Sequence, residues 1–193
     1  ASLAVMDSAG NVATSNAIPV KVVAPLMVSG TVKPVRVLVG QNVSYRANVS
    51  GGSGYYTGYS WSFGDSAQGS GRTPSHTFSQ AGTYSASVTV TDGSGATKTA
   101  SGIIVQVFGI LSATATAPNW VLKNSPVGFQ ATVTGGDGRN TYTWDFGDGS
   151  FGAGSSPTHT YTSTGAYTAA VTVKDGMSQT ATAMAAVNVV DPL

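Results

Sequence analysis

The chain repeats itself, and this constrains its fold more than any other feature of the sequence. The segment Trp61-Ser-Phe-Gly-Asp65 recurs 83 residues later as Trp144-Asp-Phe-Gly-Asp148. Further pairs match at the same offset: His76 with His159, Tyr84 with Tyr167, and Val88–Asp92 with Val171–Asp175. Because self-similarity at a fixed period marks a structural unit that occurs more than once, both copies must adopt one fold.

A third, partial copy opens the chain. Leu3–Asp7 matches Val88–Asp92, and Val20-Lys-Val22 matches Val105-Gln-Val107 in the same register. The sequence thus predicts three parts: the C-terminal strands of a preceding repeat (1–25) and two full repeats (26–109 and 110–193). Because two strands alone cannot bury an apolar face, we expect residues 1–25 to belong to a longer polypeptide or to pair with another chain.

Within each full repeat the apolar residues alternate with polar ones. Val43, Tyr45, Ala47 and Val49 fall on one side of such a run, and Gly, Pro, Ser and Asp turns separate it from the next. This period of two predicts an all-β fold of tandem antiparallel β-sandwiches. The segments that join the repeats are short and apolar, so we expect them to pack and to give a semi-rigid rod.

The composition excludes several partners. Only 9% of the residues are charged, none is Glu, and the net charge is +1. No basic face is available for nucleic acid or anionic lipid, so we expect no nucleic-acid partner. No apolar run approaches the roughly 20 residues that span a bilayer, so we expect no direct membrane insertion from this segment.

The repeated motifs resemble the signature of the PKD (polycystic kidney disease) repeat, an Ig-like β-sandwich. The residues that carry the resemblance are Trp61, Phe63, Asp65, His76 and Tyr84 in the first full copy, and Trp144, Phe146, Asp148, His159 and Tyr167 in the second. On physical grounds the Trp and Phe fill the core, and each Tyr is placed to bond back to the chain as a corner tyrosine. The aspartate accepts backbone N–H groups in its turn, and we expect the histidine to tie a neighbouring loop to it.

The same motifs contain residue types that could form a hydrolytic triad or a calcium site. His159 with Asp145 or Asp148 and a nearby Ser contains the ingredients of a hydrolytic triad. Because the histidine and the second aspartate occur in both copies, the shared fold explains them better than a reaction does, and we predict no enzyme. Asp145, Asp148 and Asp175 are weak calcium candidates, since hard cations prefer oxygen ligands, but no dense Asp cluster appears. We expect no cofactor, with calcium as the open alternative.

Features unique to one copy indicate where individual function lies. Tyr55, Tyr56, Trp120 and Phe151 are aromatic residues of loops and turns that can stack on sugars, anchor a protein partner or pack between adjacent repeats. Asn42 and Asn48 each begin an N-glycosylation sequon, and on one strand both would point to solvent.

The resemblance implies a non-catalytic extracellular structural or adhesion module. The hydroxyl-rich, charge-poor surface favours a microbial cell-surface, surface-layer or filament protein whose partners are other copies of itself, further repeats or glycans. With so few carboxylates, acid unfolding should be muted. The alternative is a secreted protease or chitinase that uses these repeats as a spacer or polysaccharide binder and carries its catalytic domain elsewhere.

Overall fold

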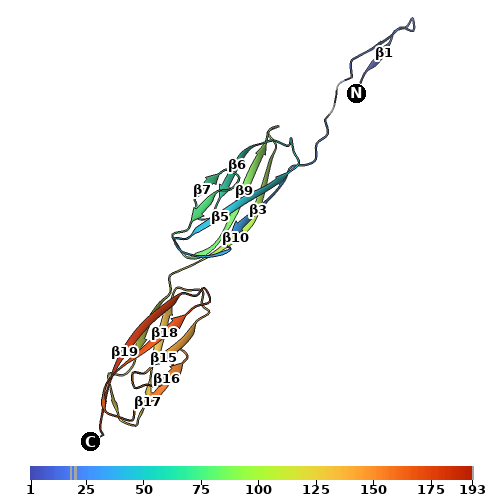
Figure 1. Cartoon of the computed structure of the whole chain (residues 1–193). Helices are drawn as coiled ribbons and strands as arrows, with labels where there is room; N and C mark the ends of the chain where they lie inside the picture. Colours follow the sequence, from blue (N-terminus) through green and yellow to red (C-terminus); the bar gives the residue numbers. More distant parts are fainter. Residues whose placement is uncertain (18, 20, 193) are drawn as a thin grey trace. The chain divides into compact units, whose positions relative to one another are not determined.

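The computed structural model describes residues 1–17, 19 and 21–192, and all of their regular structure is β-strand (Figure 1). An N-terminal hairpin consists of β1 (Ala4–Met6) and β2 (Val12–Thr14). The next strands are β3 (Met27–Lys33), β4 (Arg36–Leu38), β5 (Asn42–Ser50), β6 (Tyr56–Ser62), β7 (Gln68–Ser70), β8 (Ser75–Thr77), β9 (Gly82–Asp92) and β10 (Thr97–Phe108). The last strands are β11 (Ser112–Thr116), β12 (Trp120–Leu122), β13 (Pro126–Gly128), β14 (Gln130–Thr134), β15 (Thr141–Asp145), β16 (Phe151–Ala153), β17 (Thr158–Thr160), β18 (Gly165–Lys174) and β19 (Thr180–Val190).

The two full repeats share one sheet topology. A five-stranded sheet has the order β4-β10-β9-β6-β7 in the first repeat and β12-β19-β18-β15-β16 in the second. The opposite sheet is β3-β5-β8 in the first repeat and is divided into β11-β14 and β13-β17 in the second. The division falls at Phe129, which interrupts the strand equivalent to β5. The predicted all-β fold of tandem sandwiches is confirmed.

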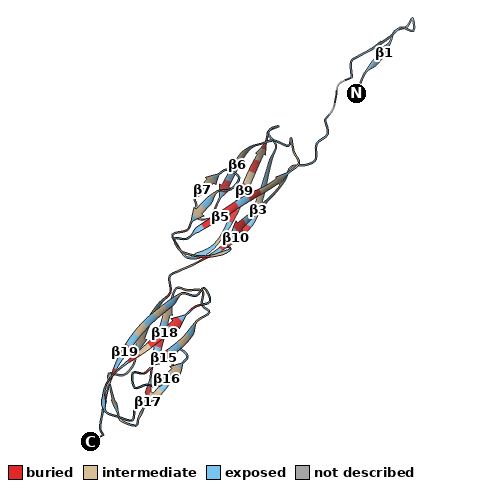
Figure 2. Cartoon of the chain, in the orientation of Figure 1, coloured by how far each residue is buried: buried red, intermediate tan, exposed pale blue. Residues whose placement is uncertain are grey.

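The alternation of apolar and polar residues along each strand determines which side chains form the core. Val43, Tyr45 and Ala47 of β5 are 0–2% exposed, while Asn42, Ser44 and Arg46 between them face solvent. Figure 2 colours the buried residues of the repeats red. Trp61 and Trp144 are 1% and 0% exposed. Burying an aromatic side chain of this size stabilises a fold by about 2–3 kcal/mol. The Trp and the two aromatic side chains around it therefore form the centre of each core, with ring centroids 5.4 Å apart in the Tyr45–Trp61 pair and 5.4 Å apart in the Phe129–Trp144 pair.

The N-terminal hairpin has no comparable core. β1 and β2 pair antiparallel, and every residue of both strands is exposed. The match of Val20-Lys-Val22 to β10 falls partly on Val20, which lies outside the described residues.

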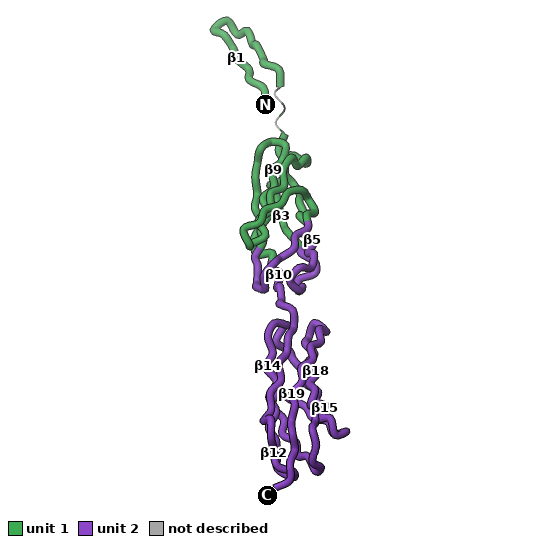
Figure 3. Tube along the Cα trace, turned by 90° about the vertical axis from the view of Figure 1, so that its left-hand side faces the viewer, with its two compact units in different colours: residues 1–31, 45–74, 86–103 green, residues 32–44, 75–85, 104–193 purple. Residues whose placement is uncertain are grey.

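By their contacts the described residues divide into two compact units (Figure 3). One comprises residues 1–31, 45–74 and 86–103, and the other comprises residues 32–44, 75–85 and 104–193. The division passes through β3, β5, β9 and β10, so it does not separate folded repeats. The boundaries at 25/26 and 109/110 and the semi-rigid rod stay predictions.

Within each unit a Gly-Gly turn holds the segment that leads into a repeat. Gly52 N donates to Ala24 O at 2.8 Å in the first unit, and Gly136 N donates to Gly109 O at 3.0 Å in the second. Also in the second unit, Asp137 Oδ2 accepts from Arg36 Nη2 at 2.7 Å. The lead-in segments are therefore hydrogen-bonded to the Gly-Gly turns.

Candidate functional site

The turn after β15 brings together the only histidine of the second repeat, an aspartate and a serine. His159 Nε2 lies 2.7 Å from Asp148 Oδ2 and 3.2 Å from Ser150 Oγ. The Ser150 hydroxyl donates to Asp148 Oδ1. Burial acts to raise the pKa of Asp148, but the hydrogen bonds from Ser150 and His159 outweigh it and lower that pKa to about 2. The carboxylate is therefore held in its charged form.

This cluster has the composition of a hydrolytic triad but not its geometry. In a triad the base bonds the nucleophile through one ring nitrogen and the carboxylate through the other. Here Ser150 and Asp148 both contact Nε2 of His159. The imidazole ring also stacks on Phe146, with centroids 4.3 Å apart, and meets Tyr161 edge-on at 4.6 Å. The histidine thus ties the turn to the core, which is the role predicted for it.

Two equivalent aspartates, Asp92 and Asp175, lie at the turns between β9 and β10 and between β18 and β19. Asp92 and Asp175 are only 2% and 4% exposed. Asp92 Oδ1 accepts from the Ser94 hydroxyl at 2.6 Å and from backbone amides, and Asp92 Oδ2 accepts from Ser53 N at 2.8 Å. The Ser94 and Ser53 bonds lower the pKa of Asp92 to about 2. Asp175 Oδ2 accepts from Asp137 N at 3.3 Å in the same way. These carboxylates cap turns.

The calcium candidates do not gather at one place. Asp145 Oδ1 accepts from Gly147 N at 2.9 Å and stays at the turn that holds Asp148. Asp145 pairs with Ala170, whereas Asp175 follows the far end of the same strand β18. Within the described ranges no three His, Cys, Asp or Glu side chains form a group that could hold a metal ion. The expectation that no cofactor is bound stays a prediction, with calcium as the open alternative, and isothermal titration calorimetry of the chelator-treated protein with calcium would test it.

The tyrosines of the signature form the expected corner bonds. Tyr84 Oη donates to Gln80 O at 3.0 Å, and Tyr167 Oη donates to Ser163 O at 3.1 Å. Two further core hydroxyls were not anticipated from the sequence. Tyr161 Oη donates to Phe146 O at 3.0 Å, while the buried Tyr45 Oη has no partner among the described residues.

The four aromatic candidates divide into three exposed side chains and one structural one. Tyr55, Trp120 and Phe151 are 69%, 68% and 71% exposed. Tyr56 is half-buried, and its hydroxyl donates to Gly51 O at 3.1 Å, so it holds the glycine turn. Three of the four are therefore free to contact a partner.

Trp120 and Phe151 lie on one face of the five-stranded sheet of the second repeat. Residues that pair across adjacent strands project from the same side of a sheet. Phe151 pairs with Asp145, Asp145 with Ala170, and Ala170 with Met184, which gives one row across four strands. A second row runs from Trp120 through Asn188 to Ala166, and Leu122 pairs with Val190 beside it. We call these nine residues the outer face of the second repeat.

At several positions the outer face is apolar where the first repeat is polar, although the Leu122–Val190 pair corresponds to the apolar pair Leu38–Phe108. Met184 is 70% exposed and Leu122 is 47% exposed, and Asp145 is the only charged residue of the nine. In the first repeat the row equivalent to Phe151, Asp145 and Ala170 reads Gln68, Ser62 and Ser87. Arg36 pairs with Gln106 where Trp120 pairs with Asn188. The sequence did not reveal this surface because it depends on register across four strands.

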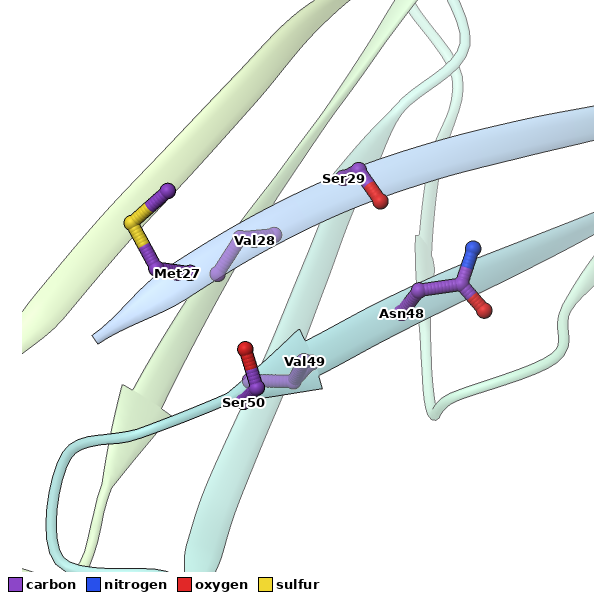
Figure 4. A pocket seen from close by; sticks show the side chains of 6 residues that line it. All are labelled: Met27, Val28, Ser29, Asn48, Val49 and Ser50. Atoms are coloured by element: carbon purple, nitrogen blue, oxygen red, sulfur yellow. The ribbon is translucent and has the colours of Figure 1, made fainter. Parts of the chain in front are cut away.

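The sequons lie on β5 of the first repeat. Asn42 is exposed, as predicted, whereas Asn48 is half-buried. Asn48 lines a shallow groove between β3 and β5 together with Met27, Val28, Ser29, Val49 and Ser50 (Figure 4). Of the two, Asn42 is the more accessible acceptor, and occupancy of both stays a prediction.

The fold and the repeated turn can be compared with those of known proteins. Two sandwiches with a repeated Trp-x-Phe-Gly-Asp turn define the class of Ig-like repeat modules. The model of the PKD domain family matches residues 23–107 and 112–189, which is most of the chain. The chain belongs to the PKD domain family, as its motifs indicated.

Of the solved structures that the chain resembles, the Ig domains of Dscam1 agree with the sandwich fold. The chain resembles the N-terminal four Ig domains of Dscam1 isoform 6.9, with 15% identity, a TM-score of 0.52, and coverage of 94% of this chain and 52% of that one. It also resembles three N-terminal domains of the outer capsid protein Hoc of bacteriophage RB49, with 20% identity, a TM-score of 0.41, and coverage of 86% and 59%. The fibronectin(III)-like modules of Clostridium thermocellum CbhA match at 17% identity and a TM-score of 0.40, over 86% of this chain and 95% of that one. This chain thus spans between half and two thirds of the Dscam1 and Hoc chains.

Proposed function

We propose that this chain is a non-catalytic, extracellular structural module of a microbial cell-surface, surface-layer or filament protein, and that it contacts other copies of that protein. The observation that carries the proposal is the difference between the two repeats. Their buried residues and turn hydrogen bonds are shared. On the outer face, by contrast, the polar positions Gln68, Ser87 and Arg36 of the first repeat are replaced by the apolar residues Phe151, Ala170 and Trp120 in the second.

The outer face of the second repeat suits contact with another protein surface. Face-to-face sheets pack about 10 Å apart, which small side chains such as Ala166 and Ala170 permit. Desolvating a charge is costly, and Asp145 is the only charged residue among these nine, while Lys174 projects from the same side of the sheet at the end of β18. Exposed apolar side chains gathered in this way mark interaction sites. Within the described residues there is no helix that could cross a membrane.

Sedimentation velocity over a wide concentration range tests the proposal. We expect the chain to associate, and we expect Met184→Lys to abolish association because it places a charge on the outer face where Met184 is 70% exposed. Ile104→Lys is the matched control, since Ile104 is 52% exposed on β10, the equivalent strand of the first repeat. A chain that stays monomeric, or one whose association survives Met184→Lys, contradicts the proposal.

A polysaccharide-binding assay addresses the alternative of an accessory repeat in a secreted hydrolase. Exposed aromatic rings also stack on sugars, and Trp120 and Phe151 lie on opposite edge strands of the sheet. A pull-down with insoluble chitin or cellulose that retains the wild type and releases Trp120→Ala would favour that function. Association without polysaccharide binding would favour the surface protein.

A further inference from the structure

The hairpin β1–β2 exposes apolar side chains that both complete repeats bury. Leu3 and Val5 are 66% and 58% exposed. Their equivalents in the shared register are Val88 and Val90 of β9 and Val171 and Val173 of β18, all of them 0% exposed. The hairpin therefore carries half of a core interface.

The hairpin is already formed in the geometry of a complete repeat. Val5 pairs with Ala13 just as Val173 pairs with Ala181. In its turn, Asp7 Oδ1 accepts from the amides two and four residues later, each at 2.9 Å. Asp175 Oδ1 accepts from the amides at the same two positions at 2.9 and 2.8 Å. The strand pairing and the turn are thus shared by the hairpin and by the second repeat.

The repeats also show which strand covers this surface. Trp144 pairs with Val171 and Tyr142 with Val173. In the first repeat, Trp61 pairs with Val88 and Tyr59 with Val90. A strand that carries Tyr-x-Trp therefore lies antiparallel to this position in both cases. The equivalent strand beside β1 would set its Trp opposite Leu3 and its Tyr opposite Val5.

The second carboxylate oxygen of the turn aspartate, Oδ2, points independently to a further segment that a complete repeat places beside the hairpin. In each repeat it accepts a backbone amide that follows a Gly-Gly pair, from Ser53 at 2.8 Å and from Asp137 at 3.3 Å. The glycine is needed because a Cβ at Gly52 would lie 2.4 Å from Asp92 Oδ2. Among the described residues, Asp7 Oδ2 accepts only from Asn11 Nδ2, at 2.8 Å.

We propose that β1–β2 is a docking surface for the front strands of a PKD-type repeat, with a Tyr-x-Trp strand beside β1 and a Gly-Gly turn that donates an amide to Asp7 Oδ2. A second copy of this chain does not supply them, because its own Tyr-x-Trp strands β6 and β15 already pair with β9 and β18. Main-chain pairing at the free edge of β1 gives affinity, and the Trp and Tyr contacts give specificity.

A fusion tests the proposal. A copy of residues 111–168 is joined directly ahead of Ala1 in the full chain, so that Ala1 takes the place of Ala169, which is 0% exposed. Amide hydrogen exchange is followed by mass spectrometry in residues 1–16 and in the two natural repeats. Because a cooperative core protects its amides by the free energy of opening, we expect exchange at Leu3–Met6 to slow at least about 10³-fold relative to the unextended chain.

The control fusion carries one additional Ser before Ala1. A shift of one residue turns Leu3 and Val5 to the opposite side of the strand, so we expect its hairpin to exchange as fast as in the unextended chain. Equal protection in both fusions, or protection in neither, would overturn the proposal. So would protection of residues 1–16 in the unextended chain that rises with protein concentration, since a second copy would then be the occupant. The natural repeats report folding of each protein independently.

Discussion

The core of the first repeat carries a buried tyrosine hydroxyl that the second repeat lacks at the equivalent position, and its removal tests the packing described above. Tyr45 is 2% exposed, and its Oη has no partner among the described residues. Leaving a buried hydroxyl unpaired costs about 1–3 kcal/mol, whereas the small void left by its removal costs a few tenths of a kcal/mol. We therefore expect Tyr45→Phe to stabilise the first repeat by about 1 kcal/mol. The second repeat has Phe129 at the equivalent position.

The same substitution at Tyr161 should have the opposite sign. Tyr161 Oη donates to Phe146 O at 3.0 Å, and both residues are buried. Tyr161→Phe loses this hydrogen bond and leaves a buried carbonyl oxygen unpaired, so we expect it to destabilise the second repeat by about 1–2 kcal/mol. Phe129→Tyr, which places a hydroxyl where Tyr45 has one, should destabilise the second repeat by a similar amount.

Hydrogen exchange measured at a series of urea concentrations assigns each change in unfolding free energy to one repeat. Peptides from β5 report on the first repeat, and peptides from β14 report on the second. For a domain of this size, about 1 kcal/mol shifts the melting temperature by about 4–8 °C. The reasoning is refuted if Tyr45→Phe destabilises the first repeat by as much as Tyr161→Phe destabilises the second. That result would mean that the Tyr45 hydroxyl is paired in solution.

Three further predictions follow from the turns and the titrating groups. Gly52 has φ +61 and no room for a Cβ beside Asp92, whereas Gly54 has φ +81 and nothing within 4 Å, so Gly52→Ala should cost about 2–4 kcal/mol and Gly54→Ala about 1 kcal/mol in thermal unfolding. The pKa of Asp148 is lowered from 3.8 to about 2, so its stabilising contribution is present above pH 4 and is lost as the pH falls from about 4 to 2. Urea unfolding at a series of pH values should show this loss, and Asp148→Asn should remove it; a loss that begins well above pH 4 would contradict the assignment. Burial raises the pKa of Tyr45 to about 12, with Asp65 adding to the shift, so the first repeat should lose stability between pH 10 and 12, and Tyr45→Phe should lose less over that range.

The core could be predicted from the sequence because it depends on alternation alone. Val43, Tyr45 and Ala47 are buried where the period of two places them, and the corner tyrosines bond where a Gly precedes a strand. Such features require only the local pattern and the strand period. Two repeats with matching patterns made the inference stronger, because a chance alternation would not recur at a constant offset.

Features that join distant segments could not be predicted in this way. Ser53 N reaches Asp92 Oδ2 across 39 residues, and nothing in either local sequence indicates that contact. Asn48 was expected to face solvent, yet it is half-buried because its end of β5 lies beside β3. The outer face of the second repeat needed the pairing of β12, β19, β18, β15 and β16 before its members could be recognised as neighbours.

The two repeats provide an internal comparison that separates folding from recognition. Substitutions between them at buried positions exchange one aromatic for another, as at Tyr45 and Phe129, and preserve the packing around the tryptophan. Substitutions on the five-stranded sheet instead change its chemistry, as from Gln68 to Phe151. An exposed aromatic contributes little to folding, because it buries little area. Stability therefore does not explain Phe151, and the proposed contact with a partner predicts that the two repeats differ in function at the outer face.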